Sequence, residues 1–451
     1  MRGKTDMTGI SKRRRIWGWF FFDWASQPYN TLLITFIFAP YMSEVIGDGA
    51  RAQTIWAFGI AAGGVIIALG APILGAMADH SGARLRWIRG FSVMYVLGAF
   101  GIWWAVPEGP NVMLILGFFV LGMIGMEFAT IFTNSMLPDL GRPDQIGRIS
   151  GNGWAFGYLG GLVALSIMLL FFAEGADTGR TLIGLAPAFG LDPGAREGTR
   201  FVGPLTGLWF IVFMVPFFLW VRDPAPVRSG AGAVRRALAE VYDTIRALPR
   251  TPSMFSYLGA SMFYRDALNG MYVFGGIYAS GVLGWSVVDV GVFGILALVA
   301  GALFAWLGGY ADDRFGPKAV IVAAILVLLF VAISIATLSR GSVYGIALPP
   351  GSAVPDILFY GCGILIGAAG GVLQSASRSM MVRQARAGQM AQCFGLYGLA
   401  GKATAFIAPS LIGAATALSG SQQIGVSPLI GLFALGLILL VWVKPGGDPS
   451  E

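Results

Sequence analysis

The sequence has little of what metal sites and thiol chemistry require. Its 451 residues include one histidine, His80, and two cysteines, Cys362 and Cys393. A zinc site needs several Cys or His ligands at short spacings, and a disulfide framework needs paired cysteines. We therefore expect no metal, no cofactor and no structural disulfide. The sequence also shows no nucleophile beside a partner base, so we do not expect an enzyme.

Charged residues are equally scarce. They make up 12% of the chain, against about 25% in an average soluble domain, whereas hydrophobic residues make up 56% and the mean hydropathy is +0.73. So few polar side chains cannot cover a water-exposed surface of this size, which excludes a soluble enzyme. The chain is predicted to be a polytopic membrane protein. Its net charge of +7 fits a signal of membrane orientation better than nucleic-acid binding.

Apolar segments long enough to cross a bilayer core of about 30 Å recur along the whole chain. The first six are expected at 16–45, 54–79, 87–106, 111–137, 146–173 and 201–221, and the second six at 254–281, 286–311, 317–338, 355–381, 389–418 and 426–443. They predict an all-α membrane protein with twelve transmembrane helices in two pseudo-symmetric six-helix bundles, 16–221 and 253–443. A cytoplasmic N-tail, 1–15, and a cytoplasmic C-tail, 444–451, flank the bundles.

The start of the chain is open to two interpretations. Basic residues 12–15 followed by apolar residues 16–22 could begin a cleaved signal peptide. However, Asp23 and Pro28 interrupt the apolar run, and no small-x-small cleavage site follows. We interpret the segment as an uncleaved membrane helix, and the absence of an organelle-targeting segment favours a bacterial inner membrane over a vacuole.

The linker between the bundles, 222–252, is the most polar stretch of the interior. Its opening Asp223-Pro-Ala-Pro cannot continue a helix. Further along, two sets of residues recur at helical spacing on opposite faces: apolar Val234, Leu238, Val241, Ile245 and Leu248, and charged Arg235, Arg236, Glu240, Asp243 and Arg246. They predict an amphipathic helix on the membrane surface. A plain surface helix is the simpler interpretation, and a regulatory partner site is the alternative.

The basic residues predict the orientation. If the N-terminus is cytoplasmic, most of the 30 Lys and Arg residues fall on the cytoplasmic side. The exceptions are Arg51, Arg180, Arg196, Arg200 and Arg340 on the other side, and Arg265 and Lys402 inside spans. The positive-inside rule then places both termini in the cytoplasm.

One short motif occurs twice. The loop after the second span reads Gly75-Ala-Met-Ala-Asp79-His-Ser-Gly82-Ala-Arg84, and the loop after the eighth reads Gly309-Tyr-Ala-Asp-Asp313-Arg-Phe-Gly316-Pro-Lys318. Glycine, aspartate, glycine and a base keep one spacing, which supports two related halves. We expect each aspartate to meet the positive N-terminal end of a neighbouring helix or a basic side chain. The alternative is that the loops only fix the topology.

Five ionisable side chains lie within predicted spans: Asp23, Glu127, Arg265, Asp266 and Lys402. Facing lipid would be costly for each, so we expect them to point into a wet cavity. Polar residues at helical spacing extend these positions into stripes: Gln27 and Asn30 with Asp23, Thr130 and Asn134 with Glu127, and Asn269 with Asp266. Arg265, Asp266 and Lys402 fall near the midplane, where transporters bind substrate between repeats. For Asp23 and Glu127 an interhelical hydrogen bond is an equal alternative.

Three carboxylates and two bases leave the predicted cavity one negative charge in excess. One of Asp23, Glu127 and Asp266 is therefore expected to protonate readily and to carry a coupled proton. Two other sources of the missing positive charge stay open, namely Arg378 in the tenth span and the ammonium group of a substrate. A zwitterionic amino acid would place its carboxylate on Arg265 or Lys402.

The repeated loop resembles the signature loop of the major facilitator superfamily. Finer features resemble the autophagy-linked vacuolar amino-acid effluxer family and its bacterial relatives: Asp23-Trp24-Ala25-Ser26, Ile149 to Gly161, Phe274 to Ala279, Gln374 to Ser379 and Phe394 to Thr404. The resemblance implies a secondary transporter whose signature loops stabilise the outward-open state, with neutral amino acids as the best-known substrates. Two residues depart from the pattern. Arg265 stands where relatives usually have a small polar residue, and His80 replaces the usual base of the loop.

These observations give a set of candidate residues. The candidates for substrate binding or coupling are Asp23, Gln27, Asn30, Glu127, Asn134, Trp154, Arg265, Asp266, Asn269, Gln374, Arg378 and Lys402. The candidates for a conformational switch are Gly75, Asp79, Gly82, Arg84, Gly309, Asp313, Gly316 and Lys318. A central cavity is expected between spans 1, 4, 5, 7, 10 and 11.

The predicted function is a monomeric secondary active transporter that works by alternating access. Its partners would be the lipid bilayer and a small polar or zwitterionic metabolite, with an amino acid favoured and a proton as one option for the coupling ion. No nucleic acid is expected. The alternatives are a non-transporting receptor or lipid scramblase on the same bundle, and a carrier for another class of metabolite.

Overall fold

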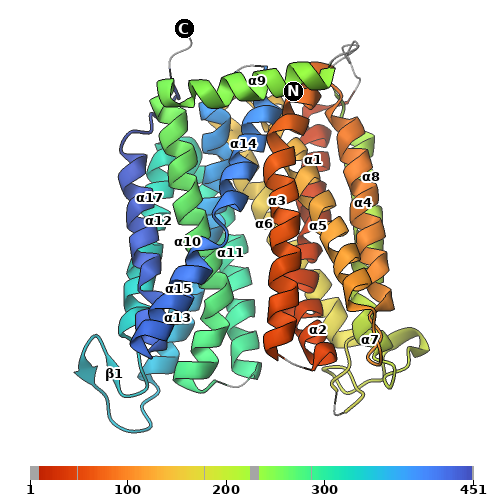
Figure 1. Ribbon diagram of the computed structural model, residues 1–451, viewed down its shortest axis with the longest axis vertical. Helices are drawn as coiled ribbons and strands as arrows, with labels where there is room; N and C mark the ends of the chain where they lie inside the picture. The colour runs from red at the N-terminus through yellow and green to blue at the C-terminus, as the bar shows by residue number, and fades with distance from the viewer. Residues whose placement is uncertain are drawn as a thin grey trace. The chain divides into compact units, whose positions relative to one another are not determined.

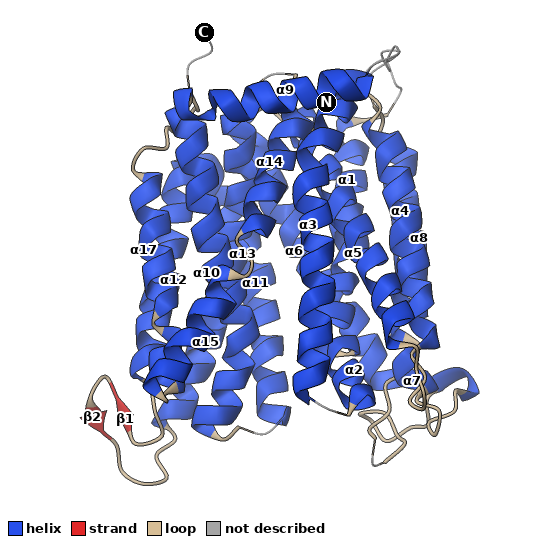
Figure 2. Ribbon diagram, viewed as in Figure 1, coloured by secondary structure: helices blue, strands red, loops and turns tan. Residues whose placement is uncertain are grey.

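The computed structural model describes residues 10–47, 49–176, 178–223, 233–285, 287–386 and 388–448. Contacts divide the chain into two compact units: unit 1, Met1–Met136 and Phe156–Ala233, and unit 2, Leu137–Ala155 and Val234–Glu451. Regular structure is almost entirely helical (Figures 1 and 2). Parts of the predicted N-tail, linker and C-tail, at 1–9, 224–232 and 449–451, lie outside the described residues.

Unit 1 contains the helices of the first six predicted spans. They are α1 (Lys12–Pro28), the π-helix η1 (Tyr29–Phe36), α2 (Phe38–Ile46), α3 (Gly49–Ser81), α4 (Arg84–Gly101), η2 (Ile102–Trp104), α5 (Val112–Ser135), most of α6 (Ile146–Phe171), η5 (Ala188–Gly190), α7 (Glu197–Arg200) and α8 (Val202–Trp220). Trp19, Tyr29, Tyr95 and Phe210 are among its fully buried large side chains.

Unit 2 contains the helices of the last six predicted spans and the linker helix. They are α9 (Ala233–Ala247), η6 (Leu248–Arg250), α10 (Pro252–Leu283), α11 (Val287–Phe315), α12 (Pro317–Thr337), α13 (Val354–Gln384), α14 (Met390–Ala403), α15 (Ile407–Ser419), α16 (Gln422–Val426) and α17 (Pro428–Leu440). It also includes η3 (Leu137–Asp139), η4 (Pro143–Gln145) and the first ten residues of α6.

All twelve predicted spans are helical, and the all-α membrane fold is confirmed. Among the described residues, nine helical segments are long and apolar enough to cross a membrane, and each coincides with a predicted span. The other three spans form α1 with η1, α4 and α10. These three contain charged residues such as Asp23, Arg89 and Arg265, which lower their apolar character.

Pro28 in the first span and Pro409 in the eleventh predict kinks in these helices, and both spans are interrupted near the proline. The first changes at Pro28 from α-helix to π-helix, where Ile37 N–H donates to Leu32 O at 3.0 Å across five residues. The eleventh breaks at 404–406, between α14 and α15 (Figure 2). A proline removes one backbone donor and disfavours a helix before it. Pro409 lies in the first turn of α15, so the break falls just ahead of the proline.

A short hairpin was not predicted from the sequence. Strands β1 (Ser342–Val343) and β2 (Ile346–Ala347) pair antiparallel between α12 and α13. The two residues between them, Tyr344 and Gly345, have φ values of 51° and 79°. Positive φ at both central positions is the type I′ turn, whose twist matches paired strands. Strands of two residues are too short to produce an alternating pattern.

The linker helix α9 lies across the end of α10 (Figure 1). Ala237 and Val241 are buried, whereas Leu238 and Ile245 of the same predicted apolar stripe are 47% and 45% exposed. The helix is therefore rotated toward its smaller apolar residues. Two hydrogen bonds tie it to the start of α14, from Gln389 to Glu240 at 2.9 Å and from Gln392 to Thr244 at 3.0 Å.

Glycines permit the closest helix contacts in each unit. In unit 1, a Cβ atom on Gly98 of α4 would lie 2.3 Å from the backbone nitrogen of Gly122 on α5. In unit 2, a Cβ atom on Gly367 of α13 would lie 2.0 Å from the carbonyl oxygen of Ala297 on α11. Small residues at such crossings let helix backbones approach in a membrane, where lipid supplies little force to drive association.

Gly98→Ala should destabilise the protein by about 1–3 kcal/mol, because the added methyl group overpacks the α4–α5 crossing. Gly90→Ala on the same helix is the matched control, since a Cβ atom there meets nothing within 4 Å. The control should instead gain about 0.5–1 kcal/mol from the lower helix cost of alanine. Thermal unfolding of the purified protein in detergent measures both variants, and equal melting temperatures would contradict the packing argument.

Candidate functional site

Arg265 of α10 lies against α14. Its Nη1 donates to the carbonyl oxygen of Tyr397 at 3.0 Å, and its guanidinium carbon lies 4.1 Å from the centre of the Tyr397 ring. A Cβ atom on Gly401 would lie 2.6 Å from Arg265 Nη1, so glycine leaves the space that the guanidinium fills. Arg265 is thus held by a hydrogen bond and by cation–π stacking.

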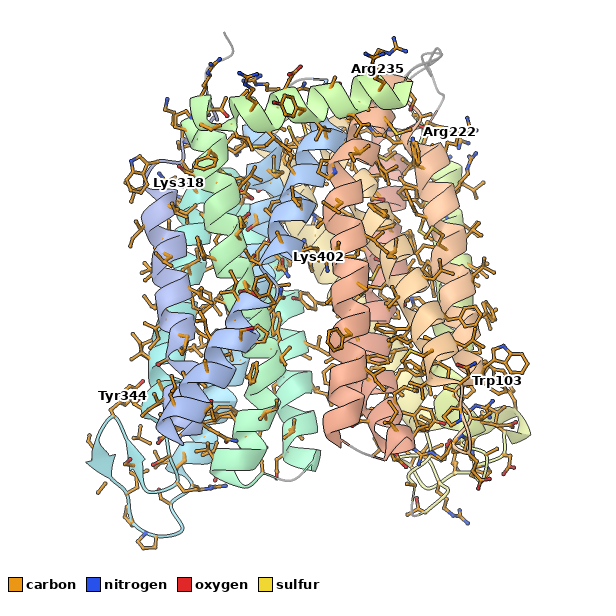
Figure 3. The ribbon with its side chains drawn as sticks, viewed as in Figure 1. Trp103, Arg222, Arg235, Lys318, Tyr344 and Lys402 are labelled. Carbon is orange, nitrogen blue, oxygen red and sulfur yellow. The ribbon has the colours of Figure 1, made fainter. Side chains whose placement is uncertain are left out.

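Lys402 follows Gly401 in the last turn of α14 (Figure 3). A cation in the last turn interacts favourably with the negative end of the helix dipole. The structure therefore brings two predicted site residues, Arg265 and Lys402, to the same end of α14. Both side chains are half-buried.

Asp266, the next residue of α10, contacts α15 on the other side of the break. Its Oδ2 accepts a hydrogen bond from the backbone N–H of Ala408 at 2.8 Å. The residue is only 2% exposed, and its Oδ1 is buried with no hydrogen-bond partner. The break between α14 and α15 therefore lies beside an arginine, a lysine and a buried carboxylate.

Asn269, predicted to share a polar stripe with Asp266, is exposed. Asp266 is buried because its side chain reaches the first turn of α15, whereas Asn269 lies about 60° away around α10 at 3.6 residues per turn. The two residues are therefore in different environments. Helical spacing predicts the shared side of a helix but cannot predict which member of a stripe a neighbouring helix covers.

Arg378 of α13 is 3% exposed and holds the start of α6. Its Nε donates to Ser150 Oγ at 2.9 Å, and its Nη2 donates to the Ser150 carbonyl oxygen at 2.7 Å. Ser150 Oγ in turn donates to the carbonyl oxygen of Ser375 at 2.7 Å. The guanidinium carbon lies 5.6 Å from the Trp154 ring centre. Two predicted site residues, Arg378 and Trp154, thus meet within unit 2, with half-buried Gln374 one turn away.

The second signature loop contacts the same segment of α6. Asp313 Oδ1 accepts from the backbone N–H of Arg148 at 3.1 Å, in the first turn of α6. The Arg148 Nε lies 3.9 Å from the other carboxylate oxygen. This arrangement is the expected one, a carboxylate at the positive end of a neighbouring helix. Its role as a switch stays a prediction.

Asp312 was not singled out from the sequence. It is 1% exposed and accepts a hydrogen bond from the Ser379 hydroxyl. A Cβ atom on Gly147 of α6 would lie 2.5 Å from the Asp312 Cγ, so the carboxylate packs directly on the helix backbone. The internal repeat gives no signal for it, because the equivalent position in the first loop is Ala78.

These contacts explain why residues 137–155 belong to unit 2, although the predicted N-terminal bundle, 16–221, includes them. A Cβ atom on Gly151 would lie 2.5 Å from the carbonyl oxygen of Ala305, and one on Gly309 would lie 2.9 Å from the carbonyl oxygen of Gly147. The start of α6 therefore packs closely on α11. Gly309, a predicted switch residue, has a steric role at this contact.

The first signature loop is built differently. Asp79 and Gly75 lie in the last turns of α3, and Arg84 Nη1 donates to the carbonyl oxygen of Ser135 at 3.1 Å, at the end of α5. The start of α4 is held by Asp223, whose Oδ2 accepts from Leu85 N–H at 2.9 Å. Burial raises the pKa of the Asp223 carboxyl, while this hydrogen bond and Arg84 act in the opposite direction.

The second glycine and the base of each motif have backbone roles. Gly82 and Gly316 have φ values of 62° and 82°, a region that favours glycine. Lys318 Nζ donates to the carbonyl oxygens of Val443 at 2.7 Å and Val441 at 3.4 Å, just after α17 ends. The base of the second loop thus satisfies carbonyls at a helix C-terminus.

In unit 1 the polar stripe of the first span lies at the contact with α6. A Cβ atom on Gly157 would lie 3.2 Å from the carbonyl oxygen of Asp23, and one on Gly161 would lie 2.9 Å from the Gln27 Cγ. Asp23, Gln27 and Asn30 are half-buried. On α5, Glu127 and Asn134 are also half-buried, and the Thr130 hydroxyl donates within its own helix to Met126 at 2.8 Å.

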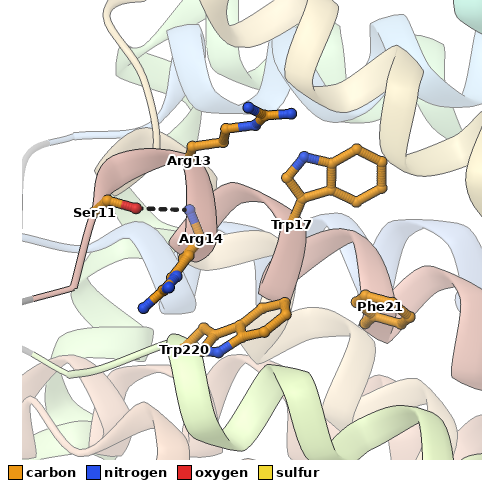
Figure 4. Close-up of a pocket in the computed structure, with 6 residues that line it drawn as sticks. All are labelled: Ser11, Arg13, Arg14, Trp17, Phe21 and Trp220. Carbon is orange, nitrogen blue, oxygen red and sulfur yellow. Dashed lines mark hydrogen bonds between the residues drawn. The ribbon is translucent and has the colours of Figure 1, made fainter. Parts of the chain in front are cut away.

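A pocket opens elsewhere, where α1 begins and α8 ends (Figure 4). Its lining residues are Ser11, Arg13, Arg14, Trp17, Phe21 and Trp220. Ser11 caps α1 by accepting from Arg14 N–H at 3.4 Å. None of the predicted site residues lines this pocket. Within the described part of the chain, no group of three or more His, Cys, Asp or Glu side chains is arranged to hold a metal ion.

The chain is similar to known proteins in sequence and in fold. The family model described as "Vacuole effluxer Atg22 like" matches residues 53–446. The uncharacterized MFS-type transporter YxiO of Bacillus subtilis is 22% identical over 430 residues, 94% of each chain. Autophagy-related protein 22-2 of Emericella nidulans is 27% identical over 325 residues, which cover 66% of this chain and 51% of that protein.

Solved structures show the same fold at low identity. The fucose:proton symporter FucP of E. coli matches with a TM-score of 0.68 and 16% identity, covering 95% of this chain and 98% of that one. The human organic anion transporter MFSD10 matches with a TM-score of 0.64 and 17% identity, covering 95% and 99%. These similarities establish the fold of major facilitator superfamily transporters.

Arg378→Lys should destabilise the protein by about 1–3 kcal/mol, because a lysine cannot reproduce both hydrogen bonds to Ser150 together with stacking on Trp154. Arg386→Lys is the control, since Arg386 is exposed just beyond α13, and surface changes usually stay within about 0.5 kcal/mol. Thermal unfolding in detergent compares the two. Unchanged stability of Arg378→Lys would show that the guanidinium contacts are not structural.

Proposed function

The chain belongs to the Atg22-like vacuole effluxer family and is a transporter of the major facilitator type, and we propose that it moves a small polar or zwitterionic metabolite, with amino acids as the substrate class. The observation that carries this proposal is the charged cluster of Arg265, Asp266 and Lys402 at the break between α14 and α15. Broken helices beside buried charge are where secondary transporters bind substrates and coupling ions.

The chemistry of the cluster suits a carboxylate. A guanidinium can bind a carboxylate through two parallel hydrogen bonds, and such charge-assisted bonds are about twice as strong as neutral ones. Tyr397 of α14 orients Arg265. Lys402 lies within two turns of Tyr397 on the same helix and adds a second positive charge. The family description, a vacuole effluxer, supports an efflux function in this family. The amino-acid class remains our proposal for this chain.

The proposed location is a bacterial inner membrane with both termini in the cytoplasm. The distribution of Lys and Arg supports this orientation, and the Bacillus relative, matched over 94% of each chain, supports a bacterial membrane. We propose a monomer as the working unit, because each major facilitator chain contains both halves of the predicted cavity.

The substrate proposal is tested by counterflow of labelled amino acids into proteoliposomes preloaded with unlabelled ones. Wild type should exchange at least one amino acid, and Arg265→Gln should lower the rate about tenfold, since losing a charge-assisted hydrogen bond costs roughly 1.5–3 kcal/mol. Arg246→Gln, which neutralises an exposed arginine of α9, should leave the rate unchanged. Comparison of the two variants separates an effect on the site from a general effect of removing a positive charge.

Two results would overturn the proposal. An absence of flux for every amino acid would remove this substrate class, and the panel would be repeated with other small polar metabolites. Scrambling of labelled lipid that persists in Arg265→Gln would instead identify a protein whose activity does not use the charged cluster.

We also propose that the contact of Asp313 with the first turn of α6 breaks during the transport cycle. Asp313→Asn should then expose the buried α6–α13 contact more often. A Ser375→Cys reporter, buried at 2% exposure, measures this through its rate of maleimide labelling in a background where Cys362 and Cys393 are replaced by serine. Removing a charge from a helix end is worth about 0.3–1 kcal/mol, so labelling should rise about two- to fivefold.

Two controls define this measurement. Asp243→Asn removes an exposed carboxylate of α9 and should not change the labelling rate. Asp313→Glu keeps the negative charge and should restore most of the protection. A rate in Asp313→Asn equal to that in Asp243→Asn would mean that the loop only fixes the topology.

A further inference from the structure

The N-terminus of α15 depends on one side chain from another helix. Four backbone positions need hydrogen-bond partners where a helix begins. After the N-cap residue Phe406, Ile407 N–H donates to Thr404 O at 2.8 Å and Pro409 has no N–H, and the regular helix bonds begin where Ser410 N–H donates to Phe406 O at 3.1 Å. The remaining donor, Ala408 N–H, bonds to the Asp266 carboxylate, 142 residues away in the chain. The N-cap residue, Phe406, offers no side-chain acceptor of its own.

The carboxylate has a second oxygen that makes no hydrogen bond. Asp266 Oδ1 is buried without a partner, and Ala408 is fully buried as well. Burying an ionised carboxylate is expensive unless other groups neutralise and hydrogen-bond it. Here one backbone N–H and the positive end of a 13-residue helix are the interactions that favour the ionised form.

The neighbouring elements supply few charges to compensate Asp266. On α10 itself the adjacent titratable residues are Tyr264 and Arg265. Of the helices packed against it, α14 carries Cys393, Tyr397 and Lys402, and α13 carries Asp356, Tyr360, Cys362, Arg378 and Arg383. Arg265 is bonded to Tyr397, and Arg378 to Ser150. Helices α15, α16 and α17 contain no titratable side chain, and those of α11 stand near its ends.

We propose that Asp266 is the residue that carries the coupling proton, and that its protonation releases the N-terminus of α15 so that the segment 404–408 can move. This inference rests on the proposed transport function. In the ionised state the carboxylate holds Ala408 N–H. When a proton binds at Oδ1, an O–H bond forms, the negative charge is lost, and the charge-assisted hydrogen bond to Ala408 weakens.

The proposed cycle transfers one proton and involves no other chemical change. One proton enters from the side of higher proton concentration and binds to Asp266, α15 loses its anchor, and the same proton leaves on the other side as the carboxylate recaptures Ala408 N–H. The break between α14 and α15 also adjoins Lys402 and Gly401, the latter in contact with Arg265. Movement of 404–408 would therefore reach the groups proposed to bind substrate.

The first test separates coupling from exchange. Asparagine has the size of a protonated aspartate and cannot release a proton, so Asp266→Asn should lose accumulation driven by a pH gradient while counterflow continues. Asp243→Asn, which neutralises an exposed carboxylate of α9, is the matched control and should keep gradient-driven accumulation. Gradient-driven accumulation by Asp266→Asn at the wild-type level would overturn the proposal.

The second test needs no substrate, so that it stands even if the proposed amino-acid class is wrong. Purified protein is titrated by infrared spectroscopy, where a protonated carboxyl gives its own C=O stretching band. Because each of the 23 Asp and Glu side chains gives such a band, the difference between the wild-type and Asp266→Asn spectra isolates the contribution of Asp266, which should appear on acidification and be retained in Asp23→Asn. Persistence of the full band in Asp266→Asn would assign the proton to another residue.

The movement itself is measured with a reporter in the break. Thr404 is 6% exposed, and Thr404→Cys in the serine background for Cys362 and Cys393 should label faster with maleimide as the pH falls. Asp266→Asn should label fast at every pH, and Asp266→Glu should restore the pH dependence. Slow, pH-independent labelling in Asp266→Asn would show that the carboxylate does not hold α15, and a melting curve confirms that each variant is folded.

Discussion

A lipid bilayer offers no water to the backbone, so a helix that breaks inside it must find hydrogen-bond partners within the protein. The eleventh span meets this requirement with one long-range contact, from Ala408 N–H to Asp266. Local carbonyls satisfy the other donors of the turn, and Pro409 removes one donor altogether. The first span avoids the problem differently, because the π-helix after Pro28 keeps its backbone bonded over a longer repeat. Irregular backbone thus occurs where polar side chains gather.

Arg378 and Arg265 both make contacts that hold neighbouring helices together. Arg378 donates to the hydroxyl and the carbonyl of Ser150, and Arg265 donates to a carbonyl while stacking on Tyr397. A guanidinium has five donors, so it can serve a structural contact and still offer further ones to a ligand. A charge count from the sequence alone assumes that each basic side chain neutralises one carboxylate. Arg378 also bonds to neutral groups at the start of α6, which a charge count does not consider.

The twelve helical spans could be predicted because the length and hydrophobicity that let a segment cross a bilayer are properties of that segment alone. The contact of Asp313 with a helix N-terminus was also expected, since the motif places a carboxylate in a loop between spans. An interruption of the eleventh span at Pro409 was predicted as a kink, whereas its extent, a turn at 404–406 that separates two helices, was not. Three features depend on which helix lies opposite: the contacts of Asp312, the packing of 137–155 in unit 2, and the burial of Asp266 rather than Asn269. One sequence does not contain that information. The substrate roles of the candidate residues stay predictions.

One interaction recurs at four helix starts. Asp313 accepts from Arg148 N–H at the start of α6, Asp223 from Leu85 N–H at the start of α4, Asp448 from Ser253 and Met254 N–H at the start of α10, and Asp266 from Ala408 N–H at the start of α15. For α4, α10 and α15 the N-cap residue itself makes no side-chain cap, so a distant aspartate takes its place.

The four aspartates differ in their surroundings, and this difference separates structural caps from a switch. Asp313, Asp223 and Asp448 lie at the ends of spans, where water or a nearby base can share the charge, as Arg148 does for Asp313. Asp266 alone of the four stands within a span, at 2% exposure. Its Oδ1 has no hydrogen-bond partner, as is also true of Asp223 Oδ1. Burial disfavours the ionised form of a carboxyl, so a cap buried within a span binds a proton more readily than one at a wet helix end. A proton can therefore decide the state of this cap and leave the other three unchanged.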